Sequence, residues 1–124
     1  MAARYLNVSE NGGVIVVQFL PPRIDDANIE PIDLELRQVL EDHGNKCVLL
    51  SFSNVEFVDA AALGRLVIFS IGVIKKSLTG KLKLCNIRPE MYDVLKDTRL
   101  NRLVKIYVDD AEALAAFGAD ARCP

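Results

Sequence analysis

Few side chains in this sequence could carry out covalent or acid–base chemistry. His43 is the only histidine among the 124 residues, so a Ser/His/Asp or Cys/His triad would have to use it. It stands beside Gly44 in a predicted helix-to-strand turn, where an ordinary solvated histidine is the simpler explanation. The sequence also lacks the glycine-rich phosphate-binding motifs. We therefore expect no enzyme, no metal site and no cofactor.

The three cysteines do not form a cluster. Cys47 and Cys85 lie in apolar runs, and Cys123 lies near the C-terminus. Their wide spacing and odd number argue against a disulfide framework or a zinc site. This usage is typical of a reduced, cytoplasmic protein with two buried thiols and one exposed thiol.

Acidic residues are the remaining candidates. The pairs Asp25–Asp26 and Asp109–Asp110 each precede a predicted helix, and Glu112 gives the second pair the spacing of a capping box. The run Val55–Val58, which is apolar apart from Glu56, predicts a short buried strand. Asp59 ends this run and directly precedes another helix. Its carboxylate should accept hydrogen bonds from the N–H groups of residues 61 or 62.

Three alanines, Ala60–Ala62, follow Asp59 and leave this helix start sterically open. An open helix N-terminus attracts anionic groups of a ligand or partner. Two interpretations stay open from the residues alone. Either Asp59 only caps the helix, or the junction is a docking edge that works through shape and dipole.

The composition limits the possible partners. Basic residues number 15 and acidic residues 17, well mixed, and the net charge of −2 argues against nucleic acid as the main partner. No uncharged apolar run approaches the roughly 18 residues of a membrane span, and the first ten residues lack an apolar signal core. We expect a cytoplasmic protein without membrane insertion.

These residues require a frame of strands and helices. Apolar and β-branched runs predict strands over residues 3–9, 14–20, 46–53, 82–87 and 103–108. Helical periodicity predicts helices over residues 29–42, 60–78, 89–97 and 109–118. Strands and helices alternate after the first hairpin, which predicts an α/β fold with a mostly parallel sheet. We expect one domain over residues 1–118 and a frayed tail over 119–124.

The predicted helix over residues 60–78 has apolar side chains outside its core face. A helical wheel at about 100° per residue places seven residues on that face: Leu63, Leu66, Val67, Ser70, Ile71, Ile74 and Leu78. Ile68, Phe69 and Val73 fall beside or behind it. Either a neighbouring helix covers this flank, or the flank binds a partner or a second copy of the chain.

The segments "VEFVDAAALGRL" and "GKLKLCNIRPEMYDVLKDTRLNRLVKIYVDDAEAL" resemble a STAS domain, the family of anti-anti-sigma factors and their relatives. The resemblance covers residues 4–117 and implies a STAS fold with the order β-β-α-β-α-β-α-β-α. It also implies a non-enzymatic regulator of transcription. Antagonists of this family bind an anti-sigma factor that is also a serine kinase. The kinase ends the contact by phosphorylating a serine directly after the family aspartate, which adds roughly −1.5 to −2 charges.

The resemblance places the family aspartate at Asp59, the Leu-Gly pair at Leu63 and Gly64, and an acidic loop position at Asp25. The phosphoacceptor position falls on Ala60, which has no hydroxyl. The predicted partner-binding surface comprises ten residues: Asp25, Asp26, Asp59, Ala60, Ala61, Leu63, Gly64, Arg65, Ile68 and Phe69.

The missing hydroxyl has three open explanations. The protein is an antagonist that this route never switches off, or the chain carries an engineered serine-to-alanine change. Alternatively, it is an adaptor in a stressosome-like or transporter-associated complex. A nucleotide or small-ligand site at the same helix start is disfavoured, because no phosphate-cradling glycine loop is present. The leading hypothesis has a serine-kinase anti-sigma factor as partner.

Overall fold

The computed structural model describes residues 5–42, 47–74, 82–102 and 104–119. Side chains are described for these residues except residues 69–74, 100 and 119. His43, Gly44, Leu78 and Cys123 therefore lie outside the description, as do the side chains of Phe69, Ser70, Ile71, Val73 and Ile74.

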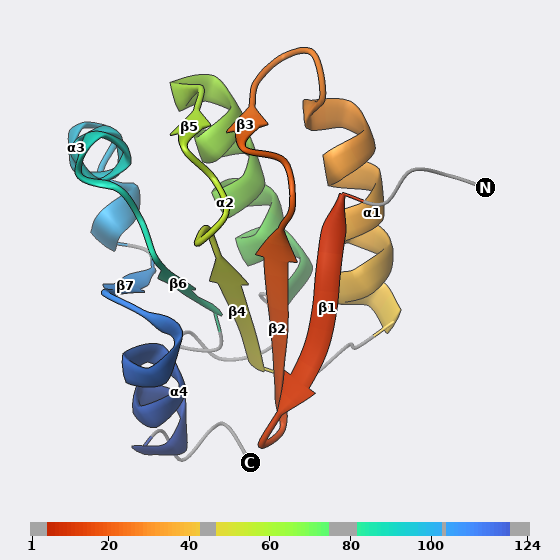
Figure 1. Ribbon diagram of the computed structural model, residues 1–124, viewed down its shortest axis with the longest axis vertical. Helices are drawn as coiled ribbons and strands as arrows, with labels where there is room; N and C mark the ends of the chain where they lie inside the picture. Colours follow the sequence, from red (N-terminus) through yellow and green to blue (C-terminus); the bar gives the residue numbers. More distant parts are fainter. Residues whose placement is uncertain (1–4, 43–46, 75–81, 103, 120–124) are drawn as a thin grey trace.

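One five-stranded sheet forms the centre of the fold (Figure 1), in the order β1-β2-β4-β6-β7. Its strands are β1 (Leu6–Asn11), β2 (Val14–Phe19), β4 (Cys47–Ser51), β6 (Leu82–Cys85) and β7 (Lys105–Tyr107). The first two strands form an antiparallel hairpin, and the remaining pairs are parallel. Gly12 and Gly13 take positive φ angles of 57° and 84° in the hairpin turn, a geometry that glycine adopts without a steric penalty. The mostly parallel sheet that the sequence predicts is confirmed.

The described residues form four α-helices: α1 (Ile29–Asp42), α2 (Ala60–Ile74), α3 (Pro89–Asp97) and α4 (Asp110–Ala119). The bounds predicted for the first and third helices are confirmed. The fourth helix continues past Gly118, and the short 3₁₀ helix η1 (Leu100–Arg102) was not predicted. The predicted end of the second helix, beyond residue 74, lies outside the described residues.

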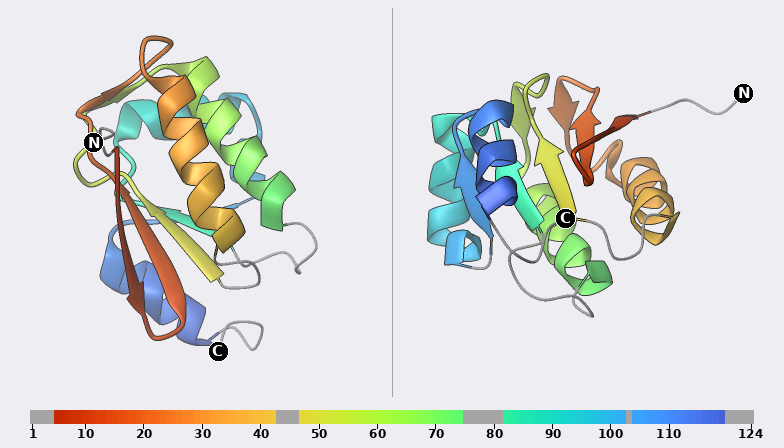
Figure 2. Two further views of the ribbon diagram at one scale, coloured as in Figure 1. Left: turned by 90° about the vertical axis from the view of Figure 1, so that its right-hand side faces the viewer. Right: turned by 90° about the horizontal axis from the view of Figure 1, so that it is seen from below.

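The two faces of the sheet are covered unequally (Figure 2). Helices α1 and α2 lie on one face, and α4 lies on the other. The larger core cluster includes Phe19 and Phe52, whose ring centroids are 4.8 Å apart, and it takes in Met91 and Leu95 of α3. A smaller cluster under α4 contains Leu49 and Phe117. All five residues of β4 are buried, as expected for a central strand between helices.

The prediction that every cysteine is reduced is wrong for Cys47, which is disulfide-bonded. Cys85 is a buried, free thiol. The prediction relied on the spacing of the cysteines along the chain. Spacing does not determine which thiols the fold brings into contact, because disulfide geometry depends on distances between the folded residues.

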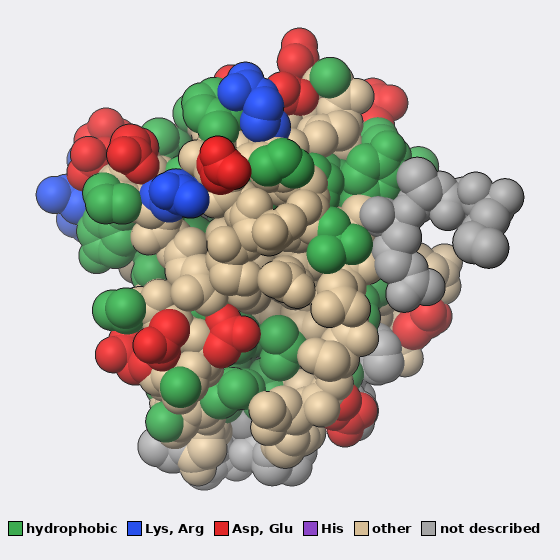
Figure 3. All heavy atoms as spheres, viewed as in Figure 1, with side chains coloured by type: hydrophobic (Ala, Val, Ile, Leu, Met, Phe, Trp, Pro, Cys, Tyr) green, Lys and Arg blue, Asp and Glu red, His purple; other side chains and the backbone are tan. Residues whose placement is uncertain are grey.

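A chain of polar contacts crosses the carboxyl end of the sheet beside α4. The Gln18 amide donates to Ser53 Oγ at 3.0 Å, and the hydroxyl oxygens of Ser51 and Ser53 lie 3.3 Å apart. Asn86 Nδ2 donates to Asp110 Oδ1 at 2.6 Å. The thiol of Cys85 also donates to Asp110, at 3.1 Å. In Figure 3, apolar and acidic side chains surround a central area of backbone and uncharged polar side chains.

Cys85 is a poor candidate for a nucleophile. Burial, together with the hydrogen bond to Asp110 and the charge of that residue, raises the pKa of the Cys85 thiol from 9.0 to about 12. A thiol that keeps its proton at neutral pH does not attack electrophiles, because the thiolate is the reactive form. The polar chain therefore fastens α4 to the sheet rather than performing chemistry.

The raised pKa of Cys85 predicts a loss of stability in alkali. Below pH 9 the thiol is protonated in both the folded and the unfolded chain. Between pH 9 and 12 only the unfolded chain loses the proton, so the free energy of unfolding falls as pH rises. Urea unfolding should show that the natural chain loses about 1 kcal/mol more than Cys85→Ala between pH 8 and pH 10. Parallel pH profiles of the two proteins would contradict this assignment.

Candidate functional site

A two-stranded parallel sheet, separate from the central one, positions the candidate site. It pairs β3 (Arg23–Ile24) with β5 (Phe57–Val58). The Phe57 N–H donates to the Pro22 carbonyl at 3.1 Å, and the Asp59 N–H donates to the Ile24 carbonyl at 2.8 Å. A short strand before Asp59 was predicted from the run Val55–Val58, whereas β3 was not predicted, because two residues are too few to show periodicity. This pairing brings the loop before α1 beside the start of α2 (Figure 1).

Asp59 caps α2 as the sequence predicts. Its Oδ2 accepts hydrogen bonds from the N–H groups of Ala61 and Ala62 at 3.1 and 3.4 Å. The Leu63 N–H donates to the Asp59 backbone carbonyl at 2.9 Å. The chain's own carboxylate therefore accepts from two of the N–H groups that would otherwise attract an anion. Ala60 and Ala61 remain exposed, whereas Ala62 is buried.

Asp25 is engaged within its own loop. Its Oδ1 accepts from the Ala27 N–H at 3.0 Å, and its Oδ2 lies 3.8 Å from the guanidinium of Arg23. The same guanidinium lies 4.6 Å from the ring centroid of Phe57, a cation–π contact. Asp26 is exposed and makes no hydrogen bond or ion pair with the residues that the structure describes. Of the two loop acids, Asp26 is the one whose charge is available to a partner.

The predicted contact residues of α2 differ in how accessible they are to a partner. Leu63 is fully buried in the core, so it cannot contact a partner. Arg65 forms an ion pair with Asp33 of α1, which is only 8% exposed. Removing the guanidinium would leave a buried carboxylate without its cation, so Arg65 joins α1 to α2. Gly64 is half-buried and Ile68 is 59% exposed, while Phe69 stays a prediction.

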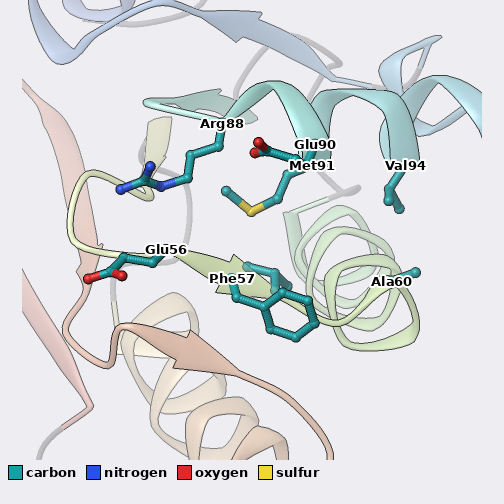
Figure 4. Close-up of a pocket in the computed structure, with 8 residues that line it drawn as sticks. Glu56, Phe57, Ala60, Arg88, Glu90, Met91 and Val94 are labelled. Carbon is teal, nitrogen blue, oxygen red and sulfur yellow. The ribbon is translucent and has the colours of Figure 1, made fainter.

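A pocket of about 440 Å³ lies beside Ala60, between β5 and α3. Eight residues line it: Glu56, Phe57, Val58, Ala60, Arg88, Glu90, Met91 and Val94. Figure 4 shows Met91 and Phe57 near its centre, Val94 and Ala60 toward one end, and Arg88 and Glu56 toward the other. Of these lining residues, only Ala60 belongs to the predicted surface. No local pattern indicates that the start of α3 faces β5 across the chain.

The described part of the chain contains no group of three or more His, Cys, Asp and Glu side chains that could hold a metal ion. Among the same residues, no helix is long and apolar enough to cross a membrane. The start of α2 therefore presents the small exposed side chains of Ala60 and Ala61 and the exposed aliphatic side chain of Ile68. The pocket between β5 and α3 adjoins them at Ala60. Such a surface can bind another molecule.

Comparisons with known proteins agree on one family. The STAS domain family matches residues 5–113. The anti-sigma F factor antagonist of Paenibacillus polymyxa is 21% identical over 109 residues, which cover 88% of this chain and 91% of that protein. An anti-sigma-factor antagonist (STAS) domain protein from Planctomyces limnophilus has a similar structure, with a TM-score of 0.79, 24% identity, and coverage of 93% of this chain and 99% of that one. The structure of the anti-sigma factor antagonist SpoIIAA in its unphosphorylated form is also similar, with a TM-score of 0.69 and 15% sequence identity. That match covers 94% of this chain and 98% of the other.

The cap at Asp59 predicts a measurable loss of stability. Asp59→Ala removes the acceptor for two N–H groups and should lower the free energy of unfolding by about 1 kcal/mol. Asp59→Asn keeps a side-chain oxygen and should lose less. Asp109→Ala is a matched control, because Asp109 accepts from the Glu112 N–H at 2.8 Å at the start of α4. Urea unfolding of the four proteins checks the prediction, and an Asp59→Ala variant as stable as the natural chain would contradict it.

Proposed function

Since the chain belongs to the STAS domain family, we propose that it is a regulatory binding protein of the anti-sigma factor antagonist type. In this proposal it docks on an anti-sigma factor that is also a serine kinase, and docking releases the sigma factor. The similarity to an anti-sigma F factor antagonist and to SpoIIAA supports this choice within the family.

The observation that carries the proposal is a stripe of small and apolar residues along α2. Ala60, Gly64 and Ile68 are spaced four residues apart, so they lie in one row on the helix surface. Ala60 is exposed, Gly64 is half-buried and Ile68 is 59% exposed. Two small residues followed by an aliphatic one let a partner's backbone approach closely and bury an apolar contact at the end.

The remaining predicted residues have unequal parts in this surface. Ala61 lies beside the stripe, and Asp26 adds an exposed negative charge on the neighbouring loop. Asp25, Asp59 and Arg65 shape the surface through their internal contacts. Phe69 remains a proposed contact from its place in the sequence.

Residue 60 determines how the contact could be reversed. Alanine offers no oxygen to a kinase, so phosphorylation cannot occur at this position in the chain as it stands. We propose that the chain binds its partner without being switched off at residue 60. A sigma-factor regulator acts in the cytoplasm, where we place this chain.

The stripe predicts that a charge at residue 68 weakens docking. Ile68→Asp should reduce binding to the serine-kinase anti-sigma factor of the native host by tenfold or more, roughly the effect of losing a buried aliphatic contact. Val108→Asp is the matched control, because Val108 is an aliphatic side chain 76% exposed, next to β7. Isothermal titration calorimetry measures both affinities. Equal affinities for Ile68→Asp and the natural chain would rule out this face.

Restoring a hydroxyl tests the proposed kinase partner. Ala60→Ser places a serine on an exposed first turn, directly after Asp59. Incubation with the anti-sigma kinase and ATP should add one phosphate to this variant and none to the natural chain, and the phosphate should weaken the complex through its charge. Intact-mass spectrometry provides the readout. An active kinase that leaves the new serine unmodified would refute the serine-kinase assignment.

A further inference from the structure

We propose that the pocket between β5 and α3 receives a large apolar side chain of the docking partner, and that lysine or arginine residues flank this side chain. This inference rests on the proposed function, because it specifies the chemistry of the partner at the same surface. It adds Glu56, Glu90, Met91 and Val94 to the interface.

The shape and lining of the pocket suit an aliphatic or aromatic anchor. Met91 and Val94 of α3 form one wall, and Phe57 and Ala60 form the facing one (Figure 4). Phe57 is 43% exposed although it is aromatic. Covering it with a partner's side chain would remove apolar surface from water, and interface energy is commonly concentrated in such filled pockets.

The pocket is continuous with the stripe on α2. Ala60 is the first residue of the stripe and also lines the pocket. A partner segment that lies along Ala60, Gly64 and Ile68 therefore passes the pocket mouth at its Ala60 end. Because Ala60 belongs to both features, one partner segment can contact the stripe and the pocket together.

Charge indicates what surrounds the anchor. Glu56 and Glu90 are exposed, and within the described part of the chain neither carboxylate takes part in a hydrogen bond or an ion pair. Nearby cations are engaged: Arg23 contacts Asp25 and Phe57, and Arg65 pairs with Asp33. Arg88 directs its Nε to the Val55 carbonyl at 3.2 Å. The two carboxylates of the pocket and Asp26 outweigh Arg88, so the surface complements a basic segment.

The same charges disfavour other occupants. A second copy of this chain would present an equivalent acidic surface in a two-fold contact, and like charges would oppose each other. An anionic small molecule would meet two carboxylates for each guanidinium. A basic segment of a protein partner avoids both conflicts.

Photo-crosslinking locates the contact. Val94 is replaced by the photoreactive amino acid p-benzoyl-L-phenylalanine, and Ile68 and Val108 are replaced in parallel variants. Each variant is irradiated with the purified anti-sigma factor, and mass spectrometry identifies the linked peptide. The expected Val94 product is a peptide with a large apolar residue and lysine or arginine within a few positions. Crosslinking from residue 68 but not from residue 94, or linkage to an acidic segment, overturns the inference and leaves docking intact. If neither the residue 68 variant nor the residue 94 variant forms a crosslink, the proposed docking face is overturned as well.

Charge variants test the sign of the partner. Glu56→Lys and Glu90→Lys should each weaken the affinity by about fivefold at low salt, as expected for reversing an exposed charge contact. Arg88→Gln should leave the affinity unchanged or increase it. Glu41→Lys is the control, because Glu41 is an exposed acid in the last turn of α1, away from the pocket. Stronger binding after Glu90→Lys, or weaker binding after Arg88→Gln, would show that the partner segment is not basic.

Discussion

The pairing of β3 with β5 is the constraint on which the candidate site depends. Each strand has two residues, and the backbone hydrogen bonds from Phe57 to Pro22 and from Asp59 to Ile24 hold them together. The pair fixes the loop before α1 against the start of α2, although these segments are more than thirty residues apart in the sequence. Asp59 ends one strand and caps the following helix, so the same residue sets where α2 begins. A surface built on backbone pairing in this way does not need reactive side chains to be well defined.

Most charged groups near α2 are used within the chain. Asp59 caps its own helix, Asp25 closes its loop, and Arg65 compensates the buried carboxylate of Asp33. What they leave for a partner is shape: exposed Ala60 and Ala61, the half-buried Gly64 and the exposed Ile68. The pocket beside Ala60 can receive a side chain of the partner, and the exposed acids Glu56 and Glu90 in its lining make this part of the surface negative. This division suits a protein that acts by docking, because the internal contacts keep the surface rigid before the partner arrives.

The sequence predicted the features that local patterns encode. The bounds of α1 and α3 followed from apolar periodicity and from prolines near the helix starts, and the cap at Asp59 followed from one aspartate before three alanines. The position of Ile68 outside the core face followed from its angle on the helix, but whether a neighbouring helix covers it was left open, and the structure shows it exposed. Features that depend on distant segments could not be predicted: the β3–β5 pairing, the Asp33–Arg65 ion pair, the disulfide at Cys47 and the part of the pocket from α3. Leu63 was assigned to the surface by resemblance, although its position on the helix also indicated the core, where the structure places it.

Hydrogen–deuterium exchange tests the central claim most directly, since it maps the docking face without altering a residue. The chain is compared alone and in complex with the serine-kinase anti-sigma factor. The account predicts slower exchange on binding in residues 56–68 and 88–94, around β5, the first half of α2 and the start of α3. It predicts unchanged exchange in α4 and β1. Protection confined to α4 and the side of the sheet that it covers, with residues 56–68 unchanged, would contradict docking at the start of α2.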